Sequence, residues 1–253
     1  MKFISILSYT VFAGIALAAP HTSKRSARRK AAGRHSQPNK YIEGSAHVTN
    51  DTNVEYSSNW SGAALITTGV TSVTGTFTVP KPSTAGSGSA WVGIDGYSND
   101  VILQTGVDWT KSGNSYSYDA WYEWYPDYAY DFSGITIAAG DEIKVTVTAT
   151  STTSGTAVVE NLTTGVTVTK TFKNEGSLGA LGEISAEWIV EDFEENDALV
   201  TFTDFGSVEF TDASAVTSAG TVGVTGATII DIKQGSTVLT TVTLPSSSEV
   251  LVT

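Results

Sequence analysis

The sequence predicts an all-β protein, a single domain built as a two-sheet antiparallel β-sandwich of the jelly-roll or concanavalin-like type. Three observations predict this class. Val, Thr, Ile, Tyr and Trp dominate from residue 55 onward and alternate with polar residues, which is typical of half-buried strands. Turn signals rich in Gly, Ser and Thr separate the runs. No stretch of ten residues combines a helical repeat with helix caps, so many short strands are expected to pack as two layers.

The individual strands follow from period-two alternation. The clearest is predicted over residues 141–150, where Ile143, Val145 and Val147 share one face and Lys144 lies on the other. Similar runs predict strands over residues 157–161, 166–172, 199–205, 208–210, 227–233 and 238–244. The turn signals between them are Thr153-Ser154-Gly155, Thr163-Thr164-Gly165, Phe205-Gly206-Ser207 and Gln234-Gly235-Ser236.

The first 54 residues are predicted to be processing segments that precede a domain over residues 55–253. Lys2, an apolar run and the small-residue site Ala16-Leu17-Ala18 form the pattern of a secretory signal peptide over residues 1–18. That run is too short to span a bilayer comfortably, and no later stretch is long and apolar enough. We therefore expect a secreted, extracellular protein without a membrane partner.

Charge is distributed unevenly along the chain. Residues 19–54 carry a formal charge of +5, whereas residues 55–253 contain 24 acidic and six basic residues and carry −18. Behind a signal peptide, the basic stretch is expected to be a propeptide that docks on the acidic body at neutral pH. It should leave when the carboxylates become protonated. Nucleic-acid binding is disfavoured, because a surface of this charge repels phosphate.

The body also lacks His, Cys and Met entirely. A Ser-His-Asp triad, a Cys-His pair and a zinc site with His or Cys ligands are therefore excluded there. Carboxylates, amides, hydroxyls and aromatic rings remain for catalysis, and no metal or other cofactor is expected.

Aromatic and acidic side chains alternate along three of the predicted strands, which predicts a cleft lined by both kinds of group. This pattern alone fits acid–base catalysis, glycoside hydrolysis by a carboxylate pair such as Glu123 and Glu191, or carbohydrate binding without catalysis. The residues that share a strand face are Trp91 with Asp95, Gln104 with Asp108, Glu187 with Glu191, and Asp119 with Trp121, Glu123 and Tyr125.

Longer motifs resemble a known family. They are Tyr-Ser-Ser-Asn-Trp-Ser-Gly at 56–62, Trp-Val-Gly-Ile-Asp-Gly at 91–96, Ile-Leu-Gln-Thr-Gly at 102–106, Tyr-Asp-Ala-Trp-Tyr-Glu-Trp-Tyr-Pro at 118–126, Glu-Asn-Leu-Thr-Thr-Gly at 160–165 and Ala-Glu-Trp-Ile-Val-Glu-Asp-Phe at 186–193. In this order they resemble the glutamic peptidases (eqolisins) of filamentous fungi. The resemblance runs from about Glu55 to the C-terminus.

This resemblance implies a sandwich of two large antiparallel sheets and a secreted acid endopeptidase that acts on proteins and peptides. It also implies a zymogen whose own propeptide serves as inhibitor. The implied catalytic dyad is Gln104, from the Ile-Leu-Gln-Thr-Gly motif, and Glu191, the second Glu of Ala-Glu-Trp-Ile-Val-Glu. The residues expected to bind substrate or support the dyad are Trp60, Asp95, Asp108, Trp121, Glu123 and Tyr125.

The implied chemistry is physically coherent and requires no metal. A Glu191 carboxylate can accept a proton from water and pass it to the leaving amine, a form of catalysis worth roughly 10²–10⁴-fold. The Gln104 amide can donate to the oxyanion, and losing one such donor costs about 10²–10³-fold. An amide suits acidic pH because, unlike imidazole, it is not protonated there.

The sequence departs from the family in two ways. It has no cysteine and therefore no disulfide. Some relatives are cut into two chains by excision of an insertion before the Trp-Val-Gly-Ile-Asp-Gly motif, and at that position this sequence has only a short Ser/Gly-rich stretch, 82–89. A single mature chain, monomeric, is therefore expected. Sequons at Asn50, Asn59 and Asn161 make a glycoprotein plausible, and Asn161, in a predicted turn, is the best candidate.

The excess of carboxylates predicts a pH effect on stability. Carboxylates without cationic partners repel one another, which raises their pKa values in the folded state. The body is therefore expected to be stable near pH 3 and less stable towards neutrality once the propeptide is gone.

Overall fold

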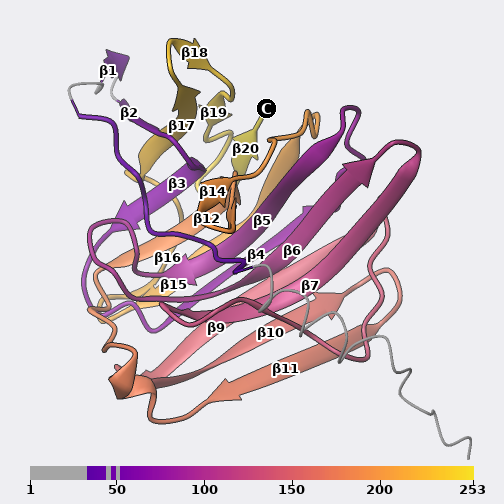
Figure 1. Ribbon diagram of the computed structural model, residues 1–253. Helices are drawn as coiled ribbons and strands as arrows, with labels where there is room; N and C mark the ends of the chain where they lie inside the picture. Colours follow the sequence, from indigo (N-terminus) through magenta and orange to yellow (C-terminus); the bar gives the residue numbers. More distant parts are fainter. Residues whose placement is uncertain (1–32, 44–46, 50–51) are drawn as a thin grey trace, which may run out of the picture.

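The computed structural model of the 253-residue chain describes residues 33–43, 47–49 and 52–253. The predicted signal peptide and the first part of the predicted propeptide lie outside these residues. Within them, two large sheets pack face to face, as Figure 1 shows, and η1 (Glu175–Ser177) is a single 3₁₀ turn. The predicted all-β sandwich is therefore confirmed. No helix in this part of the chain is long and apolar enough to cross a membrane.

The larger sheet has ten strands, in the spatial order β1-β2-β17-β3-β12-β5-β6-β7-β8, with β18 paired to β17. Its neighbours are antiparallel except for β2 and β17, which run parallel. The strands are β1 (His47–Thr49), β2 (Thr52–Ser57), β3 (Trp60–Ile66), β5 (Gly86–Ile94), β6 (Ile102–Ser112), β7 (Ser115–Tyr125), β8 (Tyr130–Asp131), β12 (Ser185–Glu191), β17 (Thr228–Gln234) and β18 (Thr237–Val238).

The smaller sheet has eight strands, in the order β11-β10-β9-β4-β15-β20-β19, with β16 paired to β15. Its members are β4 (Ser72–Thr78), β9 (Glu142–Ser151), β10 (Ser154–Asn161), β11 (Val166–Phe172), β15 (Val208–Thr217), β16 (Gly220–Val222), β19 (Val242–Thr243) and β20 (Val250–Val252). A separate two-stranded hairpin joins β13 (Glu194–Glu195) to β14 (Ala198–Leu199).

The main core lies between the two sheets and forms by strict alternation. On β12, Ala186, Trp188 and Val190 belong to this core. The Trp188 indole N–H reaches across to the Thr74 carbonyl on the other sheet at 2.8 Å. Because strand side chains alternate, Ser185, Glu187, Ile189 and Glu191 must face the opposite side.

A second, smaller core lies on that opposite face of the larger sheet. It is built from Trp60, Trp91, Trp121 and Ile189, together with other apolar side chains. The chain at residues 33–43, here called the cleft segment, crosses this face before it reaches β1 and β2 (Figure 1). The larger sheet is therefore covered on both faces, by the second sheet and by the cleft segment.

Most predicted strands are confirmed, but two were too long. Over 199–205 only Leu199 lies in a strand, because the chain turns against β5: Thr201 and Thr203 exchange backbone hydrogen bonds with Ser87. Over 238–244 the run breaks after Val238, where the Thr240 hydroxyl accepts the Ile232 N–H at 2.8 Å. In both runs, tertiary hydrogen bonds replace the strand ladder that alternation predicts.

The sequon asparagines are less accessible than expected. Asn161 is buried, and its side-chain amide donates to Asp141 at 2.8 Å and to the Thr136 carbonyl at 3.1 Å. Asn161 is the last residue of β10 and precedes the turn in which it was expected. Asn59 is fully buried as well, and Asn50 lies outside the described residues. Attached glycans would be incompatible with this packing of Asn59 and Asn161.

The predicted boundary between residues 54 and 55 falls inside β2. Val54 pairs with Ile229 of β17 and Ser57 with Ile232, so the strand continues on both sides of the boundary. A cut at this position would have to open the first part of β2, since the backbone there is held in the sheet.

Candidate active site

Three neighbouring strands bring the predicted dyad to one face of the larger sheet. Gln104 on β6 lies opposite Gly93 of β5 and Glu123 of β7. Glu191, at the end of β12, lies opposite Trp60 of β3 and Ser89 of β5. The two dyad residues thus come from strands separated only by β5, and both are fully buried.

Trp91 links these strands from its position on β5. Its indole N–H donates to Glu191 Oε2 at 2.8 Å. The neighbouring glycines leave room for the Trp91 side chain: a Cβ at Gly93 would lie 2.8 Å from its ring, and one at Gly106 would lie 2.5 Å from its own Cβ. The glycines of two sequence motifs therefore let a tryptophan occupy the sheet surface beside the acid.

Glu191 also accepts hydrogen bonds from the cleft segment. The Ser36 hydroxyl donates to its Oε2 at 2.5 Å, and the Gln37 backbone N–H donates to its Oε1 at 2.9 Å. Burial raises the pKa of Glu191 to about 8, although the hydrogen bonds from Ser36, Gln37 and Trp91 act in the opposite direction. With the segment in place, Glu191 is protonated at acidic pH.

Gln104 is oriented by the neighbouring acid on β7. Its Nε2 donates to Glu123 Oε2 at 3.0 Å. The same carboxylate oxygen accepts the Ser36 backbone N–H at 3.2 Å. Ser36 thus contacts both Glu123 and Glu191, which puts one residue of an extended peptide between the two carboxylates.

Basic side chains of the cleft segment meet acidic side chains of the body. Arg34 forms an ion pair with Asp108 at 2.5 Å, with both side chains largely buried, and its guanidinium lies 3.8 Å from the centre of the Phe193 ring. Lys40 pairs with Glu194 in a more exposed position. The charge asymmetry in the sequence therefore corresponds to local ion pairs at the cleft.

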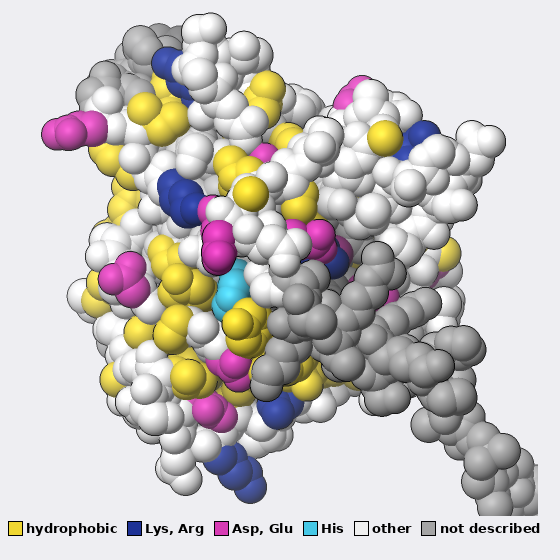
Figure 2. All heavy atoms as spheres, viewed as in Figure 1, with side chains coloured by type: hydrophobic (Ala, Val, Ile, Leu, Met, Phe, Trp, Pro, Cys, Tyr) yellow, Lys and Arg dark blue, Asp and Glu magenta, His cyan; other side chains and the backbone are white. Residues whose placement is uncertain are grey.

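A histidine lies near the middle of this face, with acidic and hydrophobic side chains around it, as Figure 2 shows. The described cleft segment contains His35, whose Nδ1 is 3.6 Å from Glu123 Oε1 and whose ring stacks on Tyr128 at 4.3 Å. Burial lowers the pKa of His35, but the hydrogen bond and charge of Glu123 outweigh it and raise the pKa overall.

The other predicted residues divide into two groups. Trp60 and Tyr125 contact the cleft segment: the Trp60 indole N–H donates to the Gln37 carbonyl at 2.8 Å, and the Tyr125 hydroxyl lies 3.4 Å from Gln37 Oε1. Trp121 instead donates to Ser89 within the sheet at 3.2 Å. These contacts place Trp60 and Tyr125 where they can touch a bound peptide.

Asp95 lies at the end of β5 and contacts none of the dyad residues. Its carboxylate accepts backbone N–H groups from Gly182, Glu183 and Ile184 at 2.6–3.0 Å. These bonds hold the loop that leads into β12. Asp95 therefore acts on the site through the position of β12.

Sequence reasoning missed three residues at the site, namely Ser36, Asn59 and Trp91. Trp91 carried a usable signal, because it lies on the same strand face as Asp95 within a quoted motif. Asn59 belongs to the motif at 56–62 and to a sequon, neither of which predicts a contact with a peptide, and the stretch around Ser36 is distinguished in the sequence only by its charge. Their contacts depend on a segment folding back over the sheet, which alternation does not encode.

Comparison with known proteins shows the family and the fold of the chain. Residues 58–253 match the Peptidase A4 family. The chain is 53% identical to Aspergillopepsin-2 from Aspergillus niger, over 98% of each chain. It is 45% identical to Scytalidopepsin B from Scytalidium lignicola, over 92% of each chain. The chain belongs to the Peptidase A4 family. It is a peptide hydrolase of the glutamic type, an eqolisin.

Solved eqolisin structures share the sandwich. Scytalido-glutamic peptidase with a transition state analog inhibitor matches with a TM-score of 0.71 at 44% identity, covering 77% of this chain and 97% of that chain. Aspergilloglutamic peptidase from Aspergillus niger matches with a TM-score of 0.63 at 59% identity, covering 66% and 98%. The predicted family, fold and enzyme class are therefore confirmed.

Membership of this family decides between the alternatives that the sequence pattern left open. A glycoside hydrolase and a carbohydrate-binding sandwich both need aromatic faces on which sugars can stack. In this peptidase Trp60 and Trp91 pack edge to face with ring centres 5.0 Å apart, and both are fully buried. Both lie on the face of the larger sheet that the cleft segment crosses, and Trp60 donates to the Gln37 carbonyl.

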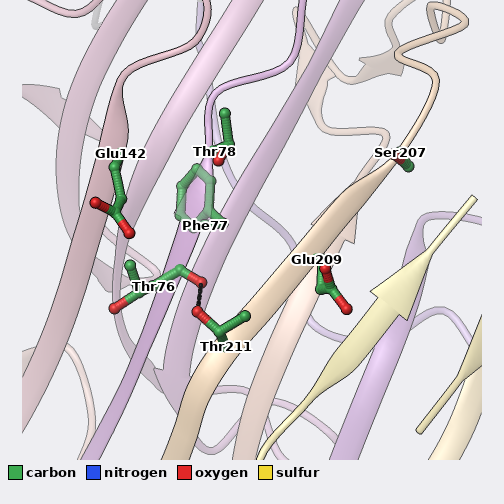
Figure 3. A pocket seen from close by; sticks show the side chains of 7 residues that line it. All are labelled: Thr76, Phe77, Thr78, Glu142, Ser207, Glu209 and Thr211. Atoms are coloured by element: carbon green, nitrogen blue, oxygen red, sulfur yellow. Dashed lines mark hydrogen bonds between the residues drawn. The ribbon is translucent and has the colours of Figure 1, made fainter. Parts of the chain in front are cut away.

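A separate groove of about 310 Å³ lies on the smaller sheet, where β4 and β15 diverge (Figure 3). Thr211 donates to the Thr76 carbonyl at 3.3 Å on one side, and Glu142 and Glu209 contribute exposed carboxylates. Gln104 and Glu191 do not line this groove. The catalytic cleft itself is filled by the cleft segment.

Proposed function

We propose that this eqolisin is a secreted acid endopeptidase in which Glu191 and Gln104 activate water against peptide bonds of proteins. One observation carries the proposal. The cleft segment lies across the larger sheet as an extended peptide and puts the peptide group between Ser36 and Gln37 beside Glu191. A face that holds one peptide in this way is suited to bind others.

The Ser36 hydroxyl marks the place of the attacking water. It lies 2.5 Å from Glu191 Oε2, at a distance suited to proton transfer. In the reaction, the Glu191 carboxylate takes a proton from water as the water oxygen attacks the carbonyl carbon. Gln104 Nε2 donates to the negative carbonyl oxygen. The Glu191 carboxyl then gives its proton to the amide nitrogen as the C–N bond breaks.

Release of the cleft segment allows Glu191 to lose its proton and to act as a carboxylate base. Burial beneath the segment raises the pKa of Glu191, so the acid is neutral in the closed precursor. Opening the cleft admits water and removes most of this desolvation, whereas the Trp91 donor remains. The carboxylate is then populated at moderately acidic pH.

The same contacts support the propeptide as an inhibitor that acidification releases. Arg34, His35 and Lys40 face Asp108, Glu123 and Glu194. Acidification lowers the negative charge of the body as a whole, and this weakens its attraction for the cationic segment. Ser36 meanwhile occupies the position of the water, which keeps the peptide beside Glu191 uncut.

The dyad is tested by Glu191→Gln and Gln104→Ala. The first removes the base and the second the oxyanion donor, so cleavage of a denatured protein at pH 3 should fall by at least about 10²-fold in each variant. Thermal melting should show that both variants remain folded. Retention of activity by Glu191→Gln would show that the dyad assignment is wrong.

The inhibitor is tested with a synthetic peptide of residues 33–43 and the processed enzyme. We expect inhibition at pH 6 that weakens at least tenfold at pH 3, because the acidic body loses negative charge on acidification while the segment stays cationic. Inhibition of equal strength at both pH values would contradict an electrostatic release.

A further inference from the structure

Asn59 lies at the edge of the cleft, immediately before β3, and the dyad chemistry does not use it. It is fully buried, so its amide needs internal partners. Its Oδ1 accepts the Lys40 backbone N–H at 2.9 Å, and its Nδ2 lies within donating distance of two carbonyls, Pro38 at 3.2 Å and Gln37 at 3.4 Å. All three partners are backbone groups of the cleft segment.

This arrangement resembles the edge of a β-strand. One side-chain amide supplies a donor and an acceptor to the N–H and C=O groups of an extended peptide, as a neighbouring peptide group would. Trp60 adds its indole N–H to the Gln37 carbonyl. Because the hydrogen bonds of Asn59 to the segment all go to backbone groups, they do not depend on the side chains of the bound peptide.

The orientation of the Asn59 amide is fixed by Ser57. The Ser57 hydroxyl accepts the backbone N–H groups of Asn59 at 3.3 Å and Trp60 at 3.1 Å, and lies 2.9 Å from Asn59 Oδ1, to which it can donate. The Lys40 N–H also requires an acceptor at this atom. Both contacts put oxygen at Oδ1 and leave Nδ2 facing the cleft.

We propose that Asn59 is a substrate-positioning residue that binds the peptide backbone on the C-terminal side of the scissile bond. The inference rests on the proposed function, in which the bond after the residue at the Ser36 position is cut. Asn59 Nδ2 also lies 3.5 Å from Glu191 Oε1, which connects the bound backbone to the catalytic acid. The positions that Asn59 binds are those of Gln37, Pro38 and Lys40, the first, second and fourth after that bond.

The test uses the processed enzyme and a series of peptides that share one N-terminal half and extend one to four residues beyond the scissile bond. In wild type, kcat/KM should rise about 10- to 100-fold along the series, as up to three hydrogen bonds to Asn59 form. In Asn59→Ala this rise should shrink to about threefold, because the hydrogen bonds to the residues beyond the scissile bond are lost, and the longest peptides should therefore lose more activity than the shortest one.

Asn161→Ala is the matched control. Asn161 is also a buried, fully hydrogen-bonded asparagine, but it lies on β10 of the smaller sheet. Its loss should lower the melting temperature and leave the dependence on peptide length unchanged. If Asn59→Ala does not fold, Asn59→Asp at pH 3 serves as the second variant. It keeps the side-chain volume and the acceptor oxygen but removes the two amide N–H donors, so the rise in kcat/KM along the peptide series should be smaller than in wild type.

Equal loss of activity on the shortest and the longest peptides would overturn the proposal, because it would show that Asn59 acts only on the fold or on Glu191. Absence of cleavage by the wild-type enzyme on every peptide would instead refute the proposed function. The two failures are therefore distinguishable.

Discussion

The ion pairs that Arg34 and Lys40 of the cleft segment form with the body differ in how far their side chains are buried. Arg34 and Asp108 are 10% and 5% exposed, so their ion pair is poorly screened by water. Lys40, paired with Glu194, is 40% exposed and belongs to the class of surface pairs that contribute little. The two cations of the cleft segment should therefore differ in how much they contribute to its binding.

Truncation of Arg34 should weaken inhibition far more than truncation of Lys40. In a peptide of residues 33–43, Arg34→Ala leaves Asp108 buried without its partner, and the inhibition constant at pH 6 should rise at least about 30-fold. Lys40→Ala should raise it by less than about fivefold. Inhibition assays with both peptides provide the comparison. Equal effects would show that total charge, and not the buried pair, determines binding.

At the scale of the element, β12 carries two acids on the cleft face, Glu191, which is proposed to be catalytic, and Glu187. All seven residues of β12 are buried. Glu187 lies opposite Gly93 in the same row as Gln104, and a hydrogen bond with the Ser185 side chain lowers its pKa without offsetting the effect of burial. Burial raises the pKa of Glu187 well above its usual value. Glu187 is therefore a neutral buried acid in the folded protein.

Glu187→Gln should stabilise the protein at neutral pH only. A raised folded-state pKa gives stability that is fully present below the unfolded-state pKa and lost as the pH rises through the folded one. The glutamine variant lacks this loss, so its free energy of unfolding at pH 7 should exceed that of wild type by about 1–3 kcal/mol. At pH 3 the two should agree. Denaturant titrations at both pH values measure the difference, and a variant that is less stable at pH 7 would contradict it.

At the scale of the whole molecule, several buried carboxyl groups make the folded protein more stable at acidic than at neutral pH. Burial raises the pKa of Asp192 to about 7 and that of Asp231 to about 6, and hydrogen bonds only partly oppose this. Together with Glu187, they are protonated in the acidic folded protein and ionised when it unfolds near neutrality. Their contribution to stability is therefore complete below about pH 4 and is lost progressively as the pH rises from about 4 to about 7.

The processed enzyme should melt at a temperature about 10 °C lower at pH 7 than at pH 3. The precursor should show a smaller difference, because the bound segment contributes cations to the cleft at neutral pH. Melting curves of both forms across this range decide the matter. Equal stability of the processed enzyme at pH 3 and pH 7 would refute the expectation.

The sequence alone determined the fold class, the charge asymmetry and, through its motifs, the candidate dyad. These are properties of short stretches: alternation fixes which side chains share a strand face, and composition excludes triads and zinc sites. The strand limits near 199–205 and 238–244 were beyond its reach, because hydrogen bonds to distant strands end those runs.

Only the tertiary structure decided which strands are neighbours and what covers them. Pairing of β12, β5 and β6 brings Glu191, Trp91 and Gln104 to one face, although they are far apart in the chain. The return of the cleft segment over that face buries the acid and gives Ser36 and Asn59 their partners. Local patterns set the orientation of each side chain along its strand, but long-range pairing and burial determine which atoms meet and which protonation state they hold.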